Sequence, residues 1–209
     1  MSDPLQTGIK YIKKNDKILK GIICCHENCN LKPSKNYFKD LVRSIISQQL
    51  SAKASSTIFK RFSKLLNYKI NPKTILKLNP VDFRIAGISI QKSKYLLHLS
   101  DIYLSDQRIF KRLYKLSNEE IIIELIKIKG IGLWTAQMFL IFSMNRLDVL
   151  PLDDIGIRNS VKLHYNLKYP PNQKKIIEIS KNWGNYSSIA VWYLWKGLDN
   201  KKITFSKNI

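Results

Sequence analysis

Apolar residues at helical spacing run through almost the whole of this sequence. Between residues 37 and 66 they recur at intervals of three and four, which places them on one face of an α-helix, and similar stripes continue to about residue 195. No stretch of the sequence alternates convincingly between apolar and polar residues, as a half-buried strand would. We therefore predict an all-α protein. The first three stripes are Phe38, Leu41, Val42, Ile45 and Ile46; Ala54, Ile58, Phe62, Leu65 and Leu66; and Tyr95, Leu96, Leu99, Ile102 and Tyr103.

The charge of the chain points to a polyanionic partner. Thirty-six Lys and Arg residues face fifteen Asp and Glu residues, a formal net charge of +21. Such a surface favours nucleic acid, although heavy use of Lys, Ile and Asn is also what AT-rich coding produces. No apolar run is long enough to cross a membrane, and the first residues lack the apolar core of a secretory signal, so we expect an intracellular protein.

The cysteines, Cys24, Cys25 and Cys29, lie close together. Adjacent cysteines do not easily reach one ion, and the sequence offers no second ligand pair downstream. We interpret them as reduced thiols at the end of a helix and in the loop after it.

Two glycines interrupt the helical pattern in the segment KGIGLWTA, which begins at Lys129. We expect Gly130 and Gly132 to adopt positive φ and to allow a second backbone to approach closely. The helix that begins after them would direct free N–H groups outward, an arrangement that binds anions such as a DNA phosphate. The alternative is an ordinary helix end, which often carries glycine.

Two carboxylates follow Pro151 at the start of another expected helix. An Asp at this position is commonly a structural N-cap. In a chain that attracts DNA, however, a carboxylate favoured by a helix dipole can stabilise positive charge developing on a sugar and orient a water molecule. That chemistry cleaves N-glycosidic bonds, with Asp153 and Asp154 as the candidates.

The runs LVRSIISQQLSAKA, GISIQKSKYL, IKGIGLWTAQMFLIF, DVLPLDDIGIRNSV and WGNYSSIAVWYLWKG resemble the helix-hairpin-helix (HhH-GPD) DNA glycosylase superfamily, in its alkylbase, 3-methyladenine DNA glycosylase II branch. They span about residues 37 to 199 in the family's order. The resemblance implies a compact two-lobed helical domain over residues 1–209. One lobe would comprise about 1–36 and 166–209 and the other about 37–165, with the hairpin at 128–133 and the active site in the cleft between the lobes.

The resemblance assigns catalysis to Asp154, because Ile157 and Arg158 stand where the family has an apolar and a basic residue after its catalytic aspartate. Asp153 would cap the helix or support the site. Relatives that also cut the DNA backbone have a lysine where this chain has Trp134. Since an indole cannot form a Schiff base, we expect a monofunctional enzyme that leaves an abasic site in base-excision repair.

Further residues acquire expected roles from the same resemblance. The base pocket would be formed by Trp134, Trp195, Met138 and Ile155, and aromatic rings suit a cationic alkylated purine. Flipping that base out of the duplex needs a plug, for which Gln49 is the first choice, Leu50 the second, and Ser51 a contact to the opposite strand. Leu50 could instead only staple a helix start. The DNA-binding hairpin would comprise Lys129, Gly130, Ile131, Gly132 and Thr135.

The family also sets the expected cofactor and partner. The carbonyls of Ile128 and Gly130 would hold a structural Na⁺ or K⁺. No cofactor would be required, and a C-terminal iron–sulfur cluster would be absent, since no cysteine follows Cys29. The partner would be damaged double-stranded DNA, bound by a monomer. The alternatives are a non-catalytic helix-hairpin-helix DNA-binding module, a glycosylase for another damaged base, and a bifunctional glycosylase/lyase, against which Trp134 argues.

Overall fold

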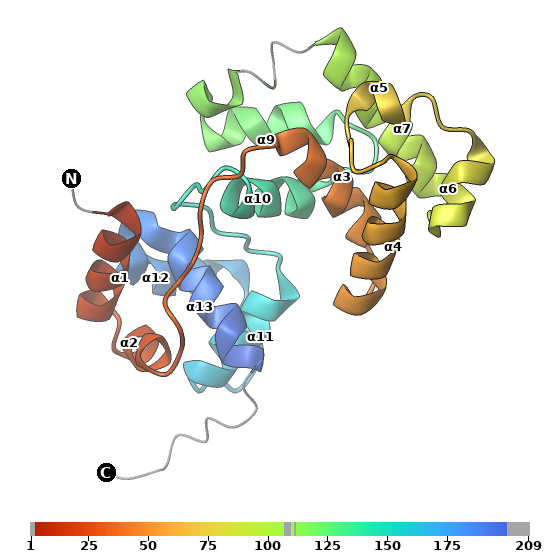
Figure 1. Ribbon diagram of the computed structural model, residues 1–209. Coiled ribbons are helices and arrows are strands. Elements are labelled where there is room, and N and C mark those ends of the chain that lie inside the picture. Colours follow the sequence, from red (N-terminus) through yellow and green to blue (C-terminus); the bar gives the residue numbers. More distant parts are fainter. Residues whose placement is uncertain (1–2, 107–109, 111, 200–209) are drawn as a thin grey trace. The chain divides into compact units, whose positions relative to one another are not determined.

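The computed structural model describes residues 3–106, 110 and 112–199. Within these ranges the chain is helical and contains no strand, so the prediction of an all-α protein is confirmed. The chain divides into two compact units, one made of residues 1–32 and 145–209 and the other of residues 33–144 (Figure 1).

The unit that contains both ends of the chain is built from α1 (Pro4–Asn15), α2 (Lys17–Cys24), α11 (Ile155–His164), α12 (Gln173–Ser180), the 3₁₀ segment η2 (Lys181–Tyr186) and α13 (Ser187–Asp199). Asp16 separates the first two helices: it ends α1, and its Oδ1 accepts the N–H groups of Ile18 and Leu19 to begin α2. Its Oδ2 accepts hydrogen bonds from Tyr165 Oη and Trp183 Nε1. This buried carboxylate therefore ties α1 and α2 to the C-terminal half of the unit.

The second unit contains α3 (Tyr37–Ser47), α4 (Ala52–Leu65), α5 (Pro72–Ile75), α6 (Pro80–Ala86), α7 (Ile90–Ser105), η1 (Leu113–Lys115), α9 (Asn118–Ile126) and α10 (Leu133–Phe142). Its core includes residues of all three predicted stripes, among them Leu41, Ile45, Phe62, Leu96 and Leu99, which are inaccessible to solvent. In the second stripe Ala54, Ile58 and Leu65 are only partly buried, and Phe59 is buried instead. The helix ends follow their local signals. Ser51 caps α4, Ser117 and Glu120 form a capping box at α9, and Gly87 ends α6 in the left-handed region.

The second boundary between the units differs from the expected one. The sequence predicts residues 145–165 in the central lobe, but they belong to the unit formed by the chain ends. Ser160 Oγ donates to the carbonyl of Leu194 at 2.6 Å, and Ser188 Oγ accepts the N–H of Val149 at 3.0 Å. Both contacts join residues more than 30 positions apart. Helix α11, with Asp154 at its start, therefore packs with α13.

Candidate active site and DNA-binding hairpin

Asp154 is the N-cap of α11, and one oxygen of its carboxylate, Oδ1, accepts two hydrogen bonds. Oδ1 accepts the backbone N–H of Ile157 at 2.8 Å and the indole Nε1–H of Trp195 at 3.0 Å. Only 7% of the residue is exposed. Two converging donors and the helix N-terminus stabilise negative charge and fix the orientation of the carboxylate. The structure thus brings together Asp154 and Trp195, which are 41 positions apart in the sequence.

Gly156 makes room for this pair, a role that was not predicted from the sequence. A Cβ at this position would lie 3.0 Å from Asp154 Oδ1 and 3.2 Å from Trp195 Cδ1 and Nε1. These separations are tighter than ordinary van der Waals contacts, so a side chain would press between the indole and the carboxylate. The only sequence signal was a glycine two residues after the aspartate, inside the first turn of a helix, where glycine is otherwise unfavourable.

Asp153 lies in a different environment from its neighbour. It is exposed, and its Oδ1 accepts a hydrogen bond from Gln173 Nε2 at 2.6 Å. Gln173 is the first residue of α12, so this contact joins the loop before α11 to the next helix. It is Asp154, and not Asp153, that caps α11. The two carboxylates are thus distinguished by burial and by partner.

The other residues expected near a base are found on both units. Ile155 is 72% exposed beside Asp154, and Trp195 is partly buried in the same unit. In the second unit Trp134 is 49% exposed and Met138 is partly buried, both on α10. Trp192 and Tyr193 are buried, so these two aromatic residues of α13 belong to the core.

The segment between α9 and α10 has the expected hairpin, with one correction. Gly130 has a φ of +89°, but Gly132 has a φ of −94° and is the N-cap of α10. The expectation of positive φ at both glycines was therefore wrong for Gly132, because an N-cap normally adopts extended geometry. A Cβ on Gly130 would lie 2.3 Å from the ring of Tyr95, so this glycine permits close packing.

The first turn of α10 is open. Gly132 provides no side-chain cap, and a Cβ placed there would meet nothing within 4 Å. Lys129 is exposed, and its N–H donates to His98 Nδ1 at 3.1 Å, which anchors the hairpin to α7. The side chains of Ile131 and Thr135 are buried, so of the expected hairpin residues these two can offer a ligand only their backbone.

The turn between α3 and α4, residues 48–51, is called the wedge turn below. Its residues Gln49, Leu50 and Ser51 are exposed, and Gln49 has a φ of +56°. Ser51 Oγ accepts the N–H of Ala54 at 3.3 Å, so that side chain is already used as a helix cap. Gln48 Nε2 donates a hydrogen bond to the carbonyl of Gly130 at 2.7 Å, and no role was expected for this residue.

Among the described residues no cluster of His, Cys, Asp or Glu could hold a metal ion, and Cys24 and Cys25 are exposed while Cys29 is buried. Burial raises the pKa of the Cys29 thiol to about 11, so little of it is thiolate at neutral pH. None of the helices among the described residues has the length and apolar character needed to cross a membrane.

A helical fold with a glycine hairpin and a buried aspartate at a helix start is the arrangement expected of the helix-hairpin-helix class, and similarity to known proteins places the chain in that class. Residues 42–185 match the family model described as HhH-GPD superfamily base excision DNA repair protein. The chain belongs to this family. It is 38% identical over 166 residues to DNA-3-methyladenine glycosylase 1 of Schizosaccharomyces pombe, covering 78% of the chain and 72% of the relative. An alkylbase DNA glycosidase-like protein of the same organism is 31% identical over 193 residues, 90% of the chain and 91% of the relative.

Solved structures support the same assignment. A DNA-3-methyladenine glycosidase from Bacillus halodurans matches with a TM-score of 0.82 and 34% identity, over 95% of the chain and 91% of that protein. A Schizosaccharomyces pombe 3-methyladenine DNA glycosylase in complex with abasic DNA matches with a TM-score of 0.80 and 32% identity, over 91% and 95% respectively. The resemblance found in the sequence is confirmed at the level of the family and its 3-methyladenine glycosylase branch.

The carbonyls of Ile128 and Gly130, named for a monovalent cation, each accept one hydrogen bond. Gly130 O accepts the hydrogen bond from Gln48 Nε2, and Ile128 O accepts the N–H of Ile131 at 3.0 Å. Because a carbonyl oxygen has two lone pairs, one hydrogen bond does not exclude a cation, and the Na⁺ or K⁺ site stays a prediction. No step proposed below depends on a metal ion.

Proposed function

We propose that this chain is a monofunctional DNA glycosylase that hydrolyses the N-glycosidic bond of alkylated purines of the 3-methyladenine type in duplex DNA. Its product would be an abasic site for base-excision repair. The observation that carries the proposal is the buried Asp154 carboxylate, fixed by Ile157 N–H and Trp195 Nε1–H in a chain of the HhH-GPD family. The alkylated-purine substrate is supported by relatives that are named for 3-methyladenine.

The reaction begins with a leaving group that is already activated. Alkylation at a purine ring nitrogen gives the base a positive charge and weakens its bond to the sugar, so departure needs little help from a general acid. The enzyme's task is then to stabilise the sugar as it becomes cationic and to orient the attacking water. Asp154 performs both roles, because a preorganised carboxylate stabilises an oxocarbenium-like transition state electrostatically.

Trp195 has two functions in this proposal. Its ring offers an electron-rich face to a cationic base, and its N–H fixes the carboxylate of Asp154. Exposed Ile155 would contact the base from the same unit, and Trp134 and Met138 are the proposed base contacts on α10. Since Trp134 takes the place of a Schiff-base lysine, no strand cleavage follows base release.

The DNA is held by its backbone in the proposal. The uncapped N-terminus of α10, with Lys129 beside it, binds a phosphate through backbone N–H groups without reading sequence. Gln49 or Leu50 fills the gap left by the flipped base, and Ser51 lies toward the opposite strand. The protein would act as a monomer on damaged duplex DNA and need no cofactor.

A base-release assay tests this proposal. A duplex that contains 3-methyladenine or 7-methylguanine is incubated with the protein, free base is quantified, and the DNA is analysed with and without alkali. We expect free methylated base, with strand breaks only after alkali. Breaks without alkali would contradict monofunctional action. Tight DNA binding without any base release would instead favour the non-catalytic binding module.

The same assay addresses the base preference. Duplexes with hypoxanthine or ethenoadenine replace the methylated ones, because neither base carries the fixed positive charge. We expect slower release from both. Faster release from either neutral base than from the methylated purines would identify a glycosylase for a different lesion and would remove the argument from cation–π attraction.

A further inference from the structure

Two side chains that hydrolysis does not use connect the wedge turn to its surroundings. The first is Gln48, the C-cap of α3. Its Nε2 donates to the carbonyl of Gly130, 2.7 Å away and 82 positions later in the sequence. Gly130 is the hairpin glycine with positive φ. One hydrogen bond thus joins the segment expected to enter the DNA to the segment expected to hold its backbone.

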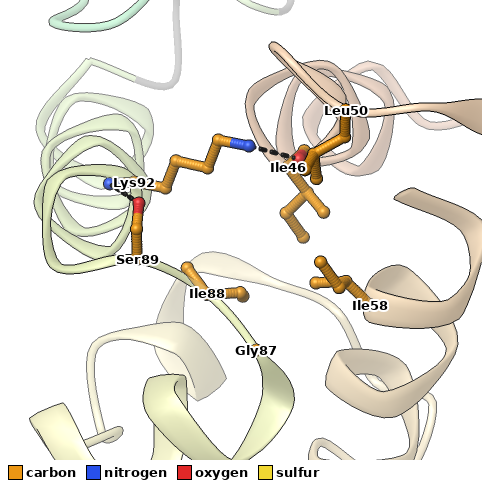
Figure 2. A pocket seen from close by; sticks show the side chains of 7 residues that line it. All are labelled: Ile46, Leu50, Ile58, Gly87, Ile88, Ser89 and Lys92. Carbon is orange, nitrogen blue, oxygen red and sulfur yellow. Dashed lines mark hydrogen bonds between the residues drawn. The ribbon is translucent and has the colours of Figure 1, made fainter. Parts of the chain in front are cut away.

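The second side chain is Lys92, in the first turn of α7. Its Nζ donates to the carbonyl of Ile46 at 2.8 Å and to that of Gln48 at 2.7 Å. Figure 2 shows Lys92 extending from α7 toward the end of α3, next to Leu50. At the C-terminus of a helix, an ammonium group donates to carbonyls that have no partner within the helix. Its positive charge also interacts favourably with the negative end of the helix dipole.

Lys92 is not an ordinary surface lysine. It lines a cavity of about 100 Å³ whose other walls include Leu50, Ile58 and Ile88 (Figure 2). Partial burial lowers the pKa of its ammonium group. Neighbouring Lys94 on the same helix is exposed, and no contact of that kind is found for its side chain within the described residues. The net charge alone therefore does not explain why a lysine is placed at position 92.

The geometry of Gln49 indicates what these contacts support. Its φ of +56° lies in the left-handed region, which a residue with a Cβ occupies only when the surrounding structure fixes it. The carbonyl of the preceding residue, Gln48, is bound by Lys92, and the side chain of Gln48 is bound to the hairpin. The unfavourable turn is thus anchored immediately before Gln49.

We propose that Lys92 and Gln48 are positioning residues that join the wedge turn to the phosphate-binding hairpin, so that insertion into the duplex and the hold on its backbone share one fixed geometry. The inference rests on the proposed glycosylase function. Neither residue contacts the reacting atoms. They would act on base flipping, which requires the plug to enter at a set distance from the bound phosphate, and would not act on cleavage of a base that is already extrahelical.

The cost of flipping can be varied through the substrate, because it is lowest for an unpaired base. The experiment therefore compares single-turnover release of 7-methylguanine opposite cytosine with release of the same base opposite an abasic site. The variants are Lys92→Met and Gln48→Ala. Lys94→Met and Gln91→Ala are matched controls, since both residues are exposed and lie beside Lys92. Lys94→Met removes the same charge as Lys92→Met.

For each variant we expect release from the paired duplex to fall about tenfold or more. Lys92→Met loses two hydrogen bonds from a charged donor, and Gln48→Ala loses the one that joins the wedge turn to the hairpin. Release of the base opposite the abasic site should stay within about twofold of wild type, because flipping an unpaired base out of the duplex costs little free energy. The controls should match wild type on both substrates. Lys92→Arg, which keeps a cationic donor, should restore part of the loss.

Other outcomes overturn the inference. An equal loss on both substrates would mean that the residues only maintain the fold or the reacting groups. An equal loss in Lys94→Met and Lys92→Met would reduce the effect to general attraction for DNA. If Lys92→Met does not fold, Gln48→Ala gives the same comparison alone. Wild-type protein that released no base from either substrate would refute the proposed function itself, a result distinguishable from every variant outcome.

Discussion

The indole N–H of Trp195 donates a hydrogen bond to Oδ1 of Asp154 at 3.0 Å. The family resemblance implies separate roles for the two residues, a place in the base pocket for Trp195 and catalysis for Asp154. Their contact makes them interdependent, because the ring that would stack on a cationic base also orients the carboxylate. Placement of the base and placement of the negative charge thereby depend on one side chain.

Trp195→Phe separates the two roles, since phenylalanine keeps an aromatic face and loses the N–H. We expect the single-turnover rate to fall by roughly 10- to 100-fold, the effect of losing one hydrogen bond to a charged group. Binding of DNA that contains an abasic site should change little. The rate and the dissociation constant are measured on methylated and abasic duplexes. A large loss of affinity at an unchanged rate would argue that Trp195 only stacks.

Gly156→Ala should lower activity without lowering stability. The new Cβ would lie 3.0 Å from Asp154 Oδ1 and 3.2 Å from the indole, and the indole must move to admit it. Alanine in a helix is favoured over glycine by about 1 kcal/mol, which offsets the crowding. Thermal unfolding and base release are measured together. A variant with wild-type activity would show that the distance between Trp195 and Asp154 is not important.

The two hairpin glycines should respond differently to alanine. At Gly130 a Cβ would overlap the Tyr95 ring and φ is positive, so Gly130→Ala should cost at least about 1–3 kcal/mol of stability. At Gly132 a Cβ meets nothing within 4 Å and φ is −94°, so the fold should tolerate Gly132→Ala. The DNA affinity of Gly132→Ala should fall, because the methyl group would obstruct access of a phosphate to the N–H groups of α10.

Denaturant unfolding measures the stability of both variants, and DNA titration measures their affinity. Unchanged affinity in Gly132→Ala would argue against phosphate binding at this position.

Alkaline pH should destabilise the unit that contains Tyr165. Burial, followed by the hydrogen bond to Asp16, raises the pKa of the Tyr165 hydroxyl far above its ordinary value. A raised pKa in the folded state contributes stability that is complete below the unfolded value of about 10 and is lost as pH rises further. The unfolding free energy should therefore fall as pH rises above about 10, and fall less in Tyr165→Phe. Tyr68→Phe, at an exposed position, is the control and should behave as wild type.

Much of this fold could be predicted because its signals are local. The caps at Ser51 and Ser117 and the stop at Gly87 depend on residues within one turn, and the structure has all three. The signals for α1 and α2 are of the same kind, since Asp3 followed by Pro4 begins α1 and Asp16 begins α2. The geometry of Gly132 was mistaken because the pattern Gly-x-Gly does not state which glycine is the turn and which the cap.

The remainder depends on contacts between distant residues. Nothing in the sequence around Asp154 shows that Trp195 donates to it, and nothing around Gln48 shows that it reaches Gly130. The assignment of residues 145–165 to the unit of the chain ends likewise results from packing of α11 on α13, which no local pattern reports. The family resemblance named the residues of the candidate site, and the structure shows the hydrogen bonds between them.

The central claim, that Asp154 is the catalytic carboxylate, is tested most directly by single-turnover release of 7-methylguanine by Asp154→Asn and Asp153→Asn. The two variants make the same chemical change at adjacent positions, and retained binding of abasic DNA shows that each is folded. We predict that Asp154→Asn loses about 10²–10³-fold in rate, as expected when a preorganised electrostatic group is removed, while Asp153→Asn stays close to wild type. Wild-type activity in Asp154→Asn, or the large loss in Asp153→Asn instead, would contradict the account.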